Sequence, residues 1–346
     1  MEASTRLSKY SRVKSALYIG FLSILVISSV SGKLHSSQAD SEIELSVEKN
    51  GSRVEFSVVD KRGDISSVEV FKNDRLFYRF YQRQETKPEN GIVTFVFDDG
   101  WLDIYTKAYP IFAKHNYPAS VAVISNYVDK PGALSSRHLH KLVGVGWDLL
   151  THSTDDRALT ELNQADQRKA LTVSQAFMWQ NYWASEIFVY PFGAYDQGII
   201  DTTERFYLAA RGYNNGLNTI PIDPFDIQIL SLENNTTLGE LTNRIYEAKI
   251  NKSALVIVGH HTGRSSEGLF AIEPELLSQT LDYISTQNIP VVTLGQLIHQ
   301  YATTNDKHID ANTLYWEFDD YLLKDGSHDF YVVVDGRRSN TDTIEI

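Results

Sequence analysis

Hydrophobic and polar residues alternate between residues 41 and 84, for example in Ile43–Val47. Alternation with a period of two is typical of strands that bury one face. Asn73 and Asp74 separate two such runs and favour a tight hairpin turn. We therefore predict a small β module over residues 41–84, followed by a polar linker over residues 85–91.

From residue 92 to residue 303, short apolar runs alternate with amphipathic helical patterns. The predicted strands are Ile92–Phe97, Ala119–Ile124, Trp147–Leu150, Ile187–Tyr190, Leu208–Arg211, Ile227–Leu230, Leu255–Val258 and Pro290–Thr293. Predicted helices between them include Gln164–Tyr182, Leu238–Ile250 and Glu273–Gln287. Regular β/α alternation over this length predicts either an open doubly wound sheet or a closed barrel. Both architectures place their chemistry at the carboxyl ends of the strands.

The helical pattern stops after residue 303. Strand-like runs follow at Thr313–Phe318 and Asp329–Val334, and Thr343–Ile346 is predicted as a last strand. Residues 304–346 are therefore predicted to form a C-terminal β extension. Neither this extension nor the β module at residues 41–84 has enough strands to be stable alone, so we expect the two to pair.

The N-terminus has the layout of an export signal. Arg6, Lys9, Arg12 and Lys14 precede an apolar run from Ala16 to Val30. We expect residues 1–32 to be a cleaved signal peptide or an uncleaved membrane anchor, although the run is shorter than the ~20 residues of a typical spanning helix. Either form predicts an exported protein that is periplasmic or secreted, or anchored in the inner membrane.

The composition limits which metal ligands and which partners are compatible with the chain. The chain has 346 residues, of which 42% are hydrophobic, so it can bury a large core. It has no cysteine, so a metal would have to be bound by histidine or carboxylate side chains. The formal net charge of −12 disfavours nucleic acid as a partner and is compatible with a neutral or cationic polymer.

Polar residues follow several of the predicted strands. Asp98 and Asp99 end the first, His152 follows the third and His260 follows the seventh. Adjacent residues leaving a strand point in different directions, so one carboxylate can bind a metal while the other acts as a base. No glycine-rich phosphate motif follows any of these strands, which disfavours nucleotide binding.

Four motifs carry a family resemblance. They are TFVFDDG at Thr94–Gly100, HSTDD at His152–Asp156, VYPFG at Val189–Gly193 and IVGH at Ile257–His260. In this order and spacing they resemble the polysaccharide deacetylases, which are the NodB-homology proteins of carbohydrate esterase family 4. The Tyr-Pro-Phe-Gly form is similar to the branch that contains the biofilm poly-N-acetylglucosamine deacetylases.

The resemblance implies a distorted (β/α) barrel of about seven strands over residues 92–303. It also implies hydrolytic, metal-dependent removal of N-acetyl groups from an amino-sugar polysaccharide. Poly-N-acetylglucosamine, a chitin-like polymer or the peptidoglycan glycan would each be a substrate of this class. One divalent metal ion is expected, with Zn²⁺ preferred and Mn²⁺, Ni²⁺ or Co²⁺ also compatible.

The resemblance also assigns roles by motif position. Asp98 would be the general base and His260, rather than its neighbour His261, the general acid; Asp99, His152 and Asp156 would bind the metal; Pro191, Phe192 and Gly193 would form the loop that donates a backbone N–H to the oxyanion. Hydrolysis of this kind needs a base to take a proton from water and a separate acid to protonate the departing amine. Trp101 is a further candidate for contact with the substrate.

Two positions depart from the family pattern. Asp156 stands where a histidine usually completes the metal site, and Asp155 is a competing ligand. Val189 stands where many members have an arginine that orients the base. These departures keep a catalytically silent carbohydrate-binding homologue open as an alternative. A glycoside hydrolase is a second alternative, although two adjacent aspartates are an awkward source of carboxyl groups ~5–9 Å apart.

Overall fold

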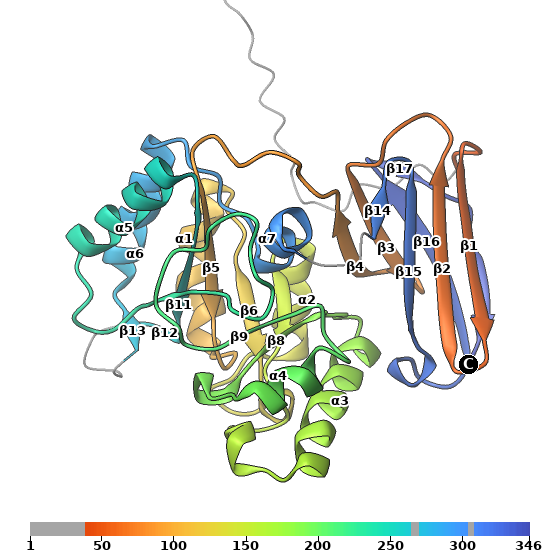
Figure 1. Cartoon of the computed structure of the whole chain (residues 1–346), viewed down its shortest axis with the longest axis horizontal. Coiled ribbons are helices and arrows are strands. Elements are labelled where there is room, and N and C mark those ends of the chain that lie inside the picture. Colours follow the sequence, from red (N-terminus) through yellow and green to blue (C-terminus); the bar gives the residue numbers. More distant parts are fainter. Residues whose placement is uncertain (1–38, 264–269, 304–307) are drawn as a thin grey trace, which may run out of the picture. The chain divides into compact units, whose positions relative to one another are not determined.

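The computed structural model describes residues 39–263, 270–303 and 308–346, and all of these belong to one compact unit (Figure 1). The predicted export segment, residues 1–32, lies outside the described residues. Within the described ranges, none of the helices combines the length and the apolar character that a membrane span requires.

Seven parallel strands form the central sheet. They are β5 (Ile92–Phe97), β6 (Ser120–Val123), β7 (Asp148–Thr151), β8 (Ile187–Val189), β9 (Ala209–Arg211), β10 (Leu230–Ser231) and β11 (Ala254–Gly259). Their order in the sheet is β10-β11-β5-β6-β7-β8-β9. The last of these strands in the sequence, β11, therefore pairs with the first, β5. This is the cyclic order of a singly wound barrel, whereas the order of a doubly wound sheet reverses at a switch point.

The barrel is open on one side. β9 and β10 are the two edges of the sheet, and the isolated bridge between Asn215 and Ile229 lies in the chain that connects them. All residues of the central strands β5 and β11 are buried, because helices cover one face and the barrel interior fills the other. The predicted distorted (β/α) barrel of about seven strands is therefore confirmed.

Seven α-helices accompany the sheet in the described part of the chain. They are α1 (Tyr109–His115), α2 (Ser136–Gly144), α3 (Gln164–Gln180), α4 (Gln197–Thr203), α5 (Leu238–Asn251), α6 (Pro274–Thr286) and α7 (Leu294–Tyr301). The predicted strand at Pro290–Thr293 is wrong, because this segment forms only one bridge, between Val291 and Val93. Pro290 has no N–H for a ladder, and the Thr293 side chain caps α7 by accepting a hydrogen bond from the Gln296 N–H.

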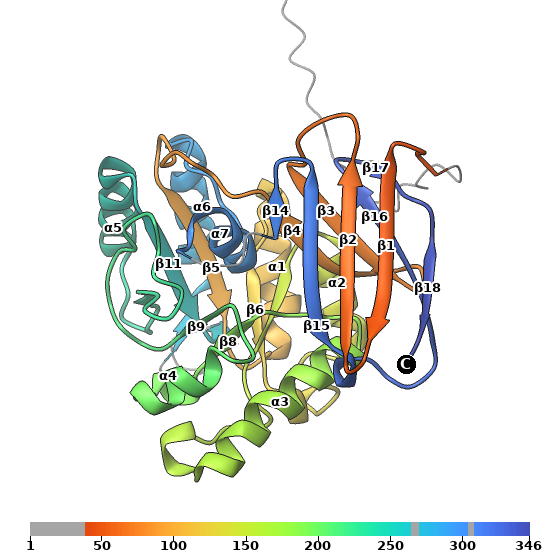
Figure 2. The same ribbon diagram turned by 45° about the vertical axis from the view of Figure 1, so that its right-hand side comes forward.

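The two terminal β segments form one module of two sheets (Figure 2). One sheet contains β1 (Ile43–Asn50), β2 (Arg53–Asp60), β15 (Thr313–Asp319) and β14 (Ile309–Asp310); the other contains β17 (Arg337–Arg338), β16 (Ser327–Val334), β3 (Ser67–Lys72) and β4 (Arg75–Tyr81), with β18 (Asp342–Glu345) on β16. The expected pairing of the N- and C-terminal pieces is confirmed, because β15 pairs with β2 and β16 pairs with β3. A short pair, β12 (His261–Thr262) and β13 (Ala271–Ile272), lies beyond β11.

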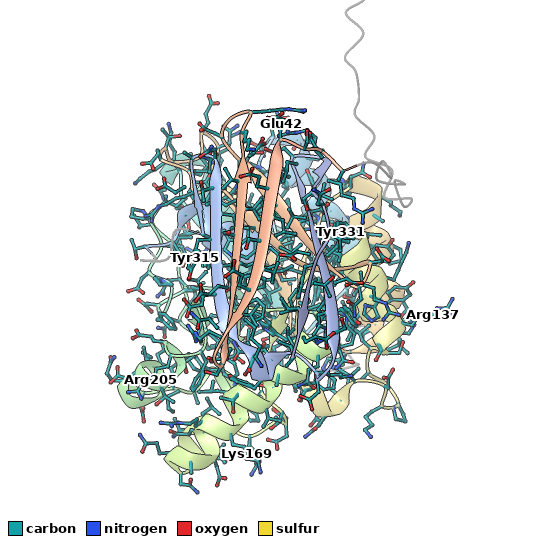
Figure 3. The ribbon with its side chains drawn as sticks, turned by 90° about the vertical axis from the view of Figure 1, so that its right-hand side faces the viewer. Glu42, Arg137, Lys169, Arg205, Tyr315 and Tyr331 are labelled. Atoms are coloured by element: carbon teal, nitrogen blue, oxygen red, sulfur yellow. The ribbon has the colours of Figure 1, made fainter. Side chains whose placement is uncertain are left out.

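Aromatic rings fill the interior of this β module. Phe56 packs edge-on against Trp316 and Phe330, with ring centroids 6.1 and 5.5 Å apart. The outward positions alternate with these, so the Tyr315 side chain is 48% exposed on β15 (Figure 3). The predicted hairpin turn is present, with left-handed φ values of 49° and 61° at Asn73 and Asp74.

Candidate active site

Asp98 is held by a buried arginine. It directly follows β5 and is 5% exposed, and its Oδ1 accepts a hydrogen bond from Nη2 of Arg211, the last residue of β9. The Arg211 side chain is itself 2% exposed, so the ion pair is shielded from water. The guanidinium keeps the carboxylate in one orientation at the carboxyl end of the sheet.

The sequence pattern did not indicate a role for Arg211. Val189 stands where an arginine is expected to orient the base, and Leu208–Arg211 has the pattern of an ordinary strand. The sequence does contain one indication of this role, namely an arginine at the end of a short apolar strand. A buried arginine is a cation that needs an anionic partner. The structure provides that cation from β9, so the valine at position 189 leaves the carboxylate of Asp98 fully paired.

Asp99 faces a different partner from Asp98. Its backbone has a left-handed φ of 68°, and its Oδ1 lies 3.4 Å from Nε2 of His152, which follows β7. The other ring nitrogen, Nδ1, lies 2.8 Å from the carbonyl oxygen of Val189 at the end of β8. A carbonyl only accepts, so Nδ1 carries a proton and Nε2 is aimed at Asp99.

Asp99 and His152 shift each other's pKa. Burial alone would raise the pKa of Asp99, but the hydrogen bond and charge of His152 lower it overall. Burial alone would lower the pKa of His152, but the Asp99 and Asp98 carboxylates raise it overall. Two ligands 2.0–2.1 Å from a tetrahedral ion lie roughly 3.3 Å apart, so the observed 3.4 Å separation fits a divalent metal.

The third predicted ligand, Asp156, lies at the rim of this pair. The residue as a whole is exposed. Partial desolvation of its carboxyl group and the charge of Asp99 raise the pKa of that group. It does not form a three-ligand group with Asp99 and His152 within 4.8 Å in the described residues. The alternative ligand Asp155 is held by two hydrogen bonds from Arg157, of 2.9 and 2.8 Å, which favours Asp156 as the available carboxylate.

His260 and His261 face different neighbours. The Nε2 atom of His260 lies 4.0 Å from Oδ2 of Asp98, on the side of the predicted base. His261 has its Nδ1 atom 2.9 Å from Oδ2 of Asp103, and its ring stacks on Trp101 with centroids 4.7 Å apart. His260, rather than His261, is therefore the histidine that faces Asp98, and the assignment of His260 as the general acid stays a prediction.

Trp101 forms a hydrogen bond with the carboxylate of Asp99. Its indole Nε1 donates to Oδ2 of Asp99 at 3.0 Å, leaving Oδ1 directed at His152. This contact orients a predicted metal ligand from outside the ligand set. The ring is only half-buried, and its contact with the substrate stays a prediction.

The loop after β8 has a single spare donor. Pro191 has no N–H, and the Gly193 N–H donates to the Tyr190 carbonyl at 2.8 Å, so Phe192 provides the remaining N–H of the predicted oxyanion loop. Gly193 has a φ of 62°, and a Cβ atom there would lie 2.5 Å from Cβ of Tyr213. Only glycine allows this close approach.

Comparisons with known proteins give a family match and two kinds of curated relative. Residues 85–210 match the model of the polysaccharide deacetylase family. A putative polysaccharide deacetylase, YxkH, of Bacillus subtilis is 26% identical over 140 residues, which cover 40% of this chain and 48% of the relative. The poly-beta-1,6-N-acetyl-D-glucosamine N-deacetylase of Staphylococcus aureus is 27% identical over 131 residues, which cover 34% of this chain and 45% of the relative. The chain thus spans about half the length of the curated relatives it matches.

Solved structures with a similar chain path include the Bc1960 peptidoglycan N-acetylglucosamine deacetylase, with a TM-score of 0.46 and 16% identity. The similarity covers 62% of this chain and 91% of that chain. The family 4 carbohydrate esterase from Streptomyces lividans gives a TM-score of 0.43 at 14% identity and covers 63% of this chain and 100% of that chain. The barrel topology is the one expected of a NodB-type domain, and the family match covers residues 85–210. The predicted resemblance to the polysaccharide deacetylase family is confirmed.

Proposed function

We propose that the protein is a metal-dependent hydrolase that removes N-acetyl groups from an amino-sugar polysaccharide. The observation that carries the proposal is the arrangement at the carboxyl edge of the sheet. Asp98, fixed by Arg211, lies beside the facing donors of Asp99 and His152. A divalent ion bound by these two residues and Asp156, Zn²⁺ by donor type, would polarise the acetyl carbonyl and activate water.

Two side chains carry out the proton transfers, and one backbone N–H stabilises the oxyanion. Asp98 accepts a proton from the water that attacks the acetyl carbon, and the Phe192 N–H donates to the carbonyl oxygen as negative charge develops. His260 then protonates the amide nitrogen as the C–N bond breaks. The products are acetate and a free amine on the sugar, so one water is consumed for each acetyl group.

The substrate we propose is a polymer of N-acetylglucosamine, of the β-1,6-linked type. The similarity to the Staphylococcus aureus deacetylase and the Tyr-Pro-Phe-Gly loop support this choice. Two aromatic side chains of the site are well exposed, with Phe192 at 69% and Tyr213 at 44%. Such rings can pack on sugar faces without displacing core residues.

Removal of the metal is expected to abolish acetate release. Asp98 and His260 remain in place without the ion, but the carbonyl is then no longer polarised. The test treats the full chain with a chelator, verifies metal loss by elemental analysis, and measures acetate before and after Zn²⁺ is restored. Unchanged activity in verified metal-free protein would rule out this mechanism.

We also propose that residues 1–32 direct export, from their basic and then apolar pattern. The mass of protein extracted from the cell envelope should lack about this segment. An intact N-terminus in that fraction would indicate an anchor instead.

A further inference from the structure

A second group of metal-type ligands lies at the opposite end of β8. Glu186 directly precedes this strand, whereas Val189, whose carbonyl holds His152, is its last residue. At about 3.3 Å per residue, the two ends are roughly 10 Å apart. Glu186 meets His299 of α7 and His308, which precedes β14, and their ligand atoms lie within 4.8 Å of one another. Within the described ranges this is the one group of three that satisfies that distance.

The spacing of the ligand atoms fits a tetrahedral ion. Nε2 of His308 lies 3.3 Å from Oε2 of Glu186, and Nε2 of His299 lies 3.6 Å from the same oxygen. Ligands 2.0–2.1 Å from Zn²⁺ are about 3.3–3.4 Å apart in a tetrahedral site. An ion could therefore enter with shifts of only a few tenths of an ångström.

Both oxygens of Glu186 are already oriented. Oε1 accepts a hydrogen bond from Nε1 of Trp316 at 3.0 Å, and Oε2 accepts one from the Tyr78 hydroxyl at 2.8 Å. The same hydroxyl lies 3.2 Å from Nε2 of His299. Outer contacts of this kind fix a carboxylate ligand in the orientation that a metal requires.

The donor types also suit a metal. The group offers one carboxylate and two imidazole rings, which are the side chains that bind Zn²⁺ where no cysteine is available.

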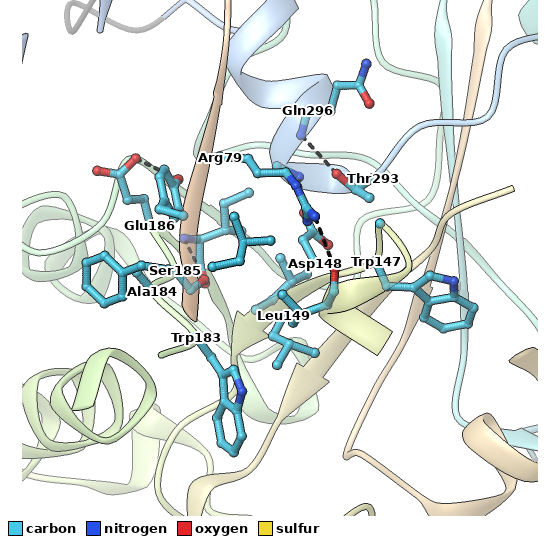
Figure 4. Close-up of a pocket in the computed structure, with 18 of the residues that line it drawn as sticks. Arg79, Trp147, Asp148, Leu149, Trp183, Ala184, Ser185, Glu186, Thr293 and Gln296 are labelled. Carbon is cyan, nitrogen blue, oxygen red and sulfur yellow. Dashed lines mark hydrogen bonds between the residues drawn. The ribbon is translucent and has the colours of Figure 1, made fainter. Parts of the chain in front are cut away.

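Pockets reach the group from two sides. One, of about 60 Å³, is lined by Tyr78, Asp148, Glu186 and His299 among others, with Glu186 at its edge in Figure 4. A second, of about 180 Å³, is lined by Arg53, Gln175, Glu186, His308 and Glu317 among others. Both open toward solvent and provide the entry path that a metal site needs.

We propose that Glu186, His299 and His308 bind a structural Zn²⁺ or similar divalent transition metal that joins the barrel to the β module. Glu186 and His299 belong to the barrel, and the contacts of Glu186 with Tyr78 on β4 and Trp316 on β15 belong to the β module. Two nitrogen donors and one oxygen donor select Zn²⁺ over Ca²⁺ or Mg²⁺, which prefer oxygen ligands. A water would take the fourth position, and the Tyr78 hydroxyl would stay a donor to Glu186. This site is independent of the proposed catalytic metal.

Metal stoichiometry in a catalytic-site variant tests the proposal. Asp99→Asn combined with His152→Gln removes the catalytic donors and leaves the second group intact. Full-length protein of this variant is stripped, loaded with Zn²⁺ and desalted, and we expect about one Zn²⁺ per chain. Adding His308→Gln should remove it, whereas adding His115→Gln, in an unrelated histidine–carboxylate pair with Asp282, should not. At 100-fold excess over Kd, Zn²⁺ should raise Tm by roughly 5 °C in the first variant and in its His115→Gln derivative, but not in its His308→Gln derivative.

Co²⁺ provides a second measurement that needs no change to the group itself. In the Asp99→Asn/His152→Gln variant, bound Co²⁺ should give the intense visible absorption of a tetrahedral site. No retained Zn²⁺ and no such absorption would overturn the proposal, as would Zn²⁺ retained equally after His308→Gln. The metal bound at the proposed catalytic site is measured separately, as the difference in Zn²⁺ per chain between the wild-type protein and this variant. Failure of the proposed function is therefore distinguishable from failure of the second site.

Discussion

Asp98→Asn is expected to lower the rate of acetate release by about 10²–10⁴-fold while leaving the metal content unchanged. The asparagine amide cannot take the proton from the attacking water. Its oxygen can still accept the hydrogen bond from Arg211. Because the buried guanidinium then lacks its anion, circular dichroism first verifies that the variant is folded. The measurement combines elemental analysis with an assay for acetate, on the same preparation.

Asp99→Asn is the matched variant, one residue along the chain. Its carboxylate faces His152 rather than Arg211, so this change should reduce metal content and activity together. Metal should bind at least 10-fold more weakly, because an anionic ligand is replaced by a neutral one. If Asp98→Asn loses the metal and Asp99→Asn keeps it, the two roles are reversed.

Arg211→Met is expected to destabilise the fold by about 3–5 kcal/mol, because it leaves a buried carboxylate without its cation. Asp98 is 5% exposed and the Arg211 side chain 2%, so water cannot replace the lost partner. Activity should fall as well, since the base loses its orientation. Urea unfolding followed by circular dichroism measures the free energy of unfolding directly.

Two controls isolate the buried pair. Arg157→Met removes the arginine of an exposed pair with Asp155, whose side chains are 58% and 32% exposed, and should cost less than 1 kcal/mol. Adding Asp98→Asn to Arg211→Met should recover part of the lost stability, because the unpaired charge is gone. A loss for Arg211→Met no larger than that for Arg157→Met would show that the pair contributes little.

Local pattern predicted the architecture well. The strand Ile92–Phe97 was predicted with the bounds observed for β5, and the hairpin turn at Asn73 and Asp74 is present. These features depend on the residues of one segment, namely an apolar run and two residues that tolerate positive φ. The failed strand at Pro290–Thr293 shows the limit, since a helix cap competed for the same residues.

Partners across the sheet could not be predicted in the same way. Arg211 reaches Asp98 from 113 residues away, and the Val189 carbonyl orients His152 from 37 residues away. No local pattern carries such a contact, because it depends on which strands become neighbours. The motifs indicated the candidate catalytic and metal-binding residues, whereas the contacts that hold these side chains are visible only in the folded structure.

Product stoichiometry on a β-1,6-linked N-acetylglucosamine oligomer tests the central claim most directly. With the Zn²⁺-loaded full chain, we expect acetate and primary amine in equal amounts and no new reducing ends. With Asp98→Asn, both products should form about 10²–10⁴-fold more slowly. New reducing ends without acetate would contradict the claim and indicate a glycoside hydrolase. Binding of the oligomer with no product from fully metal-loaded protein would contradict it as well, and would indicate a carbohydrate-binding homologue.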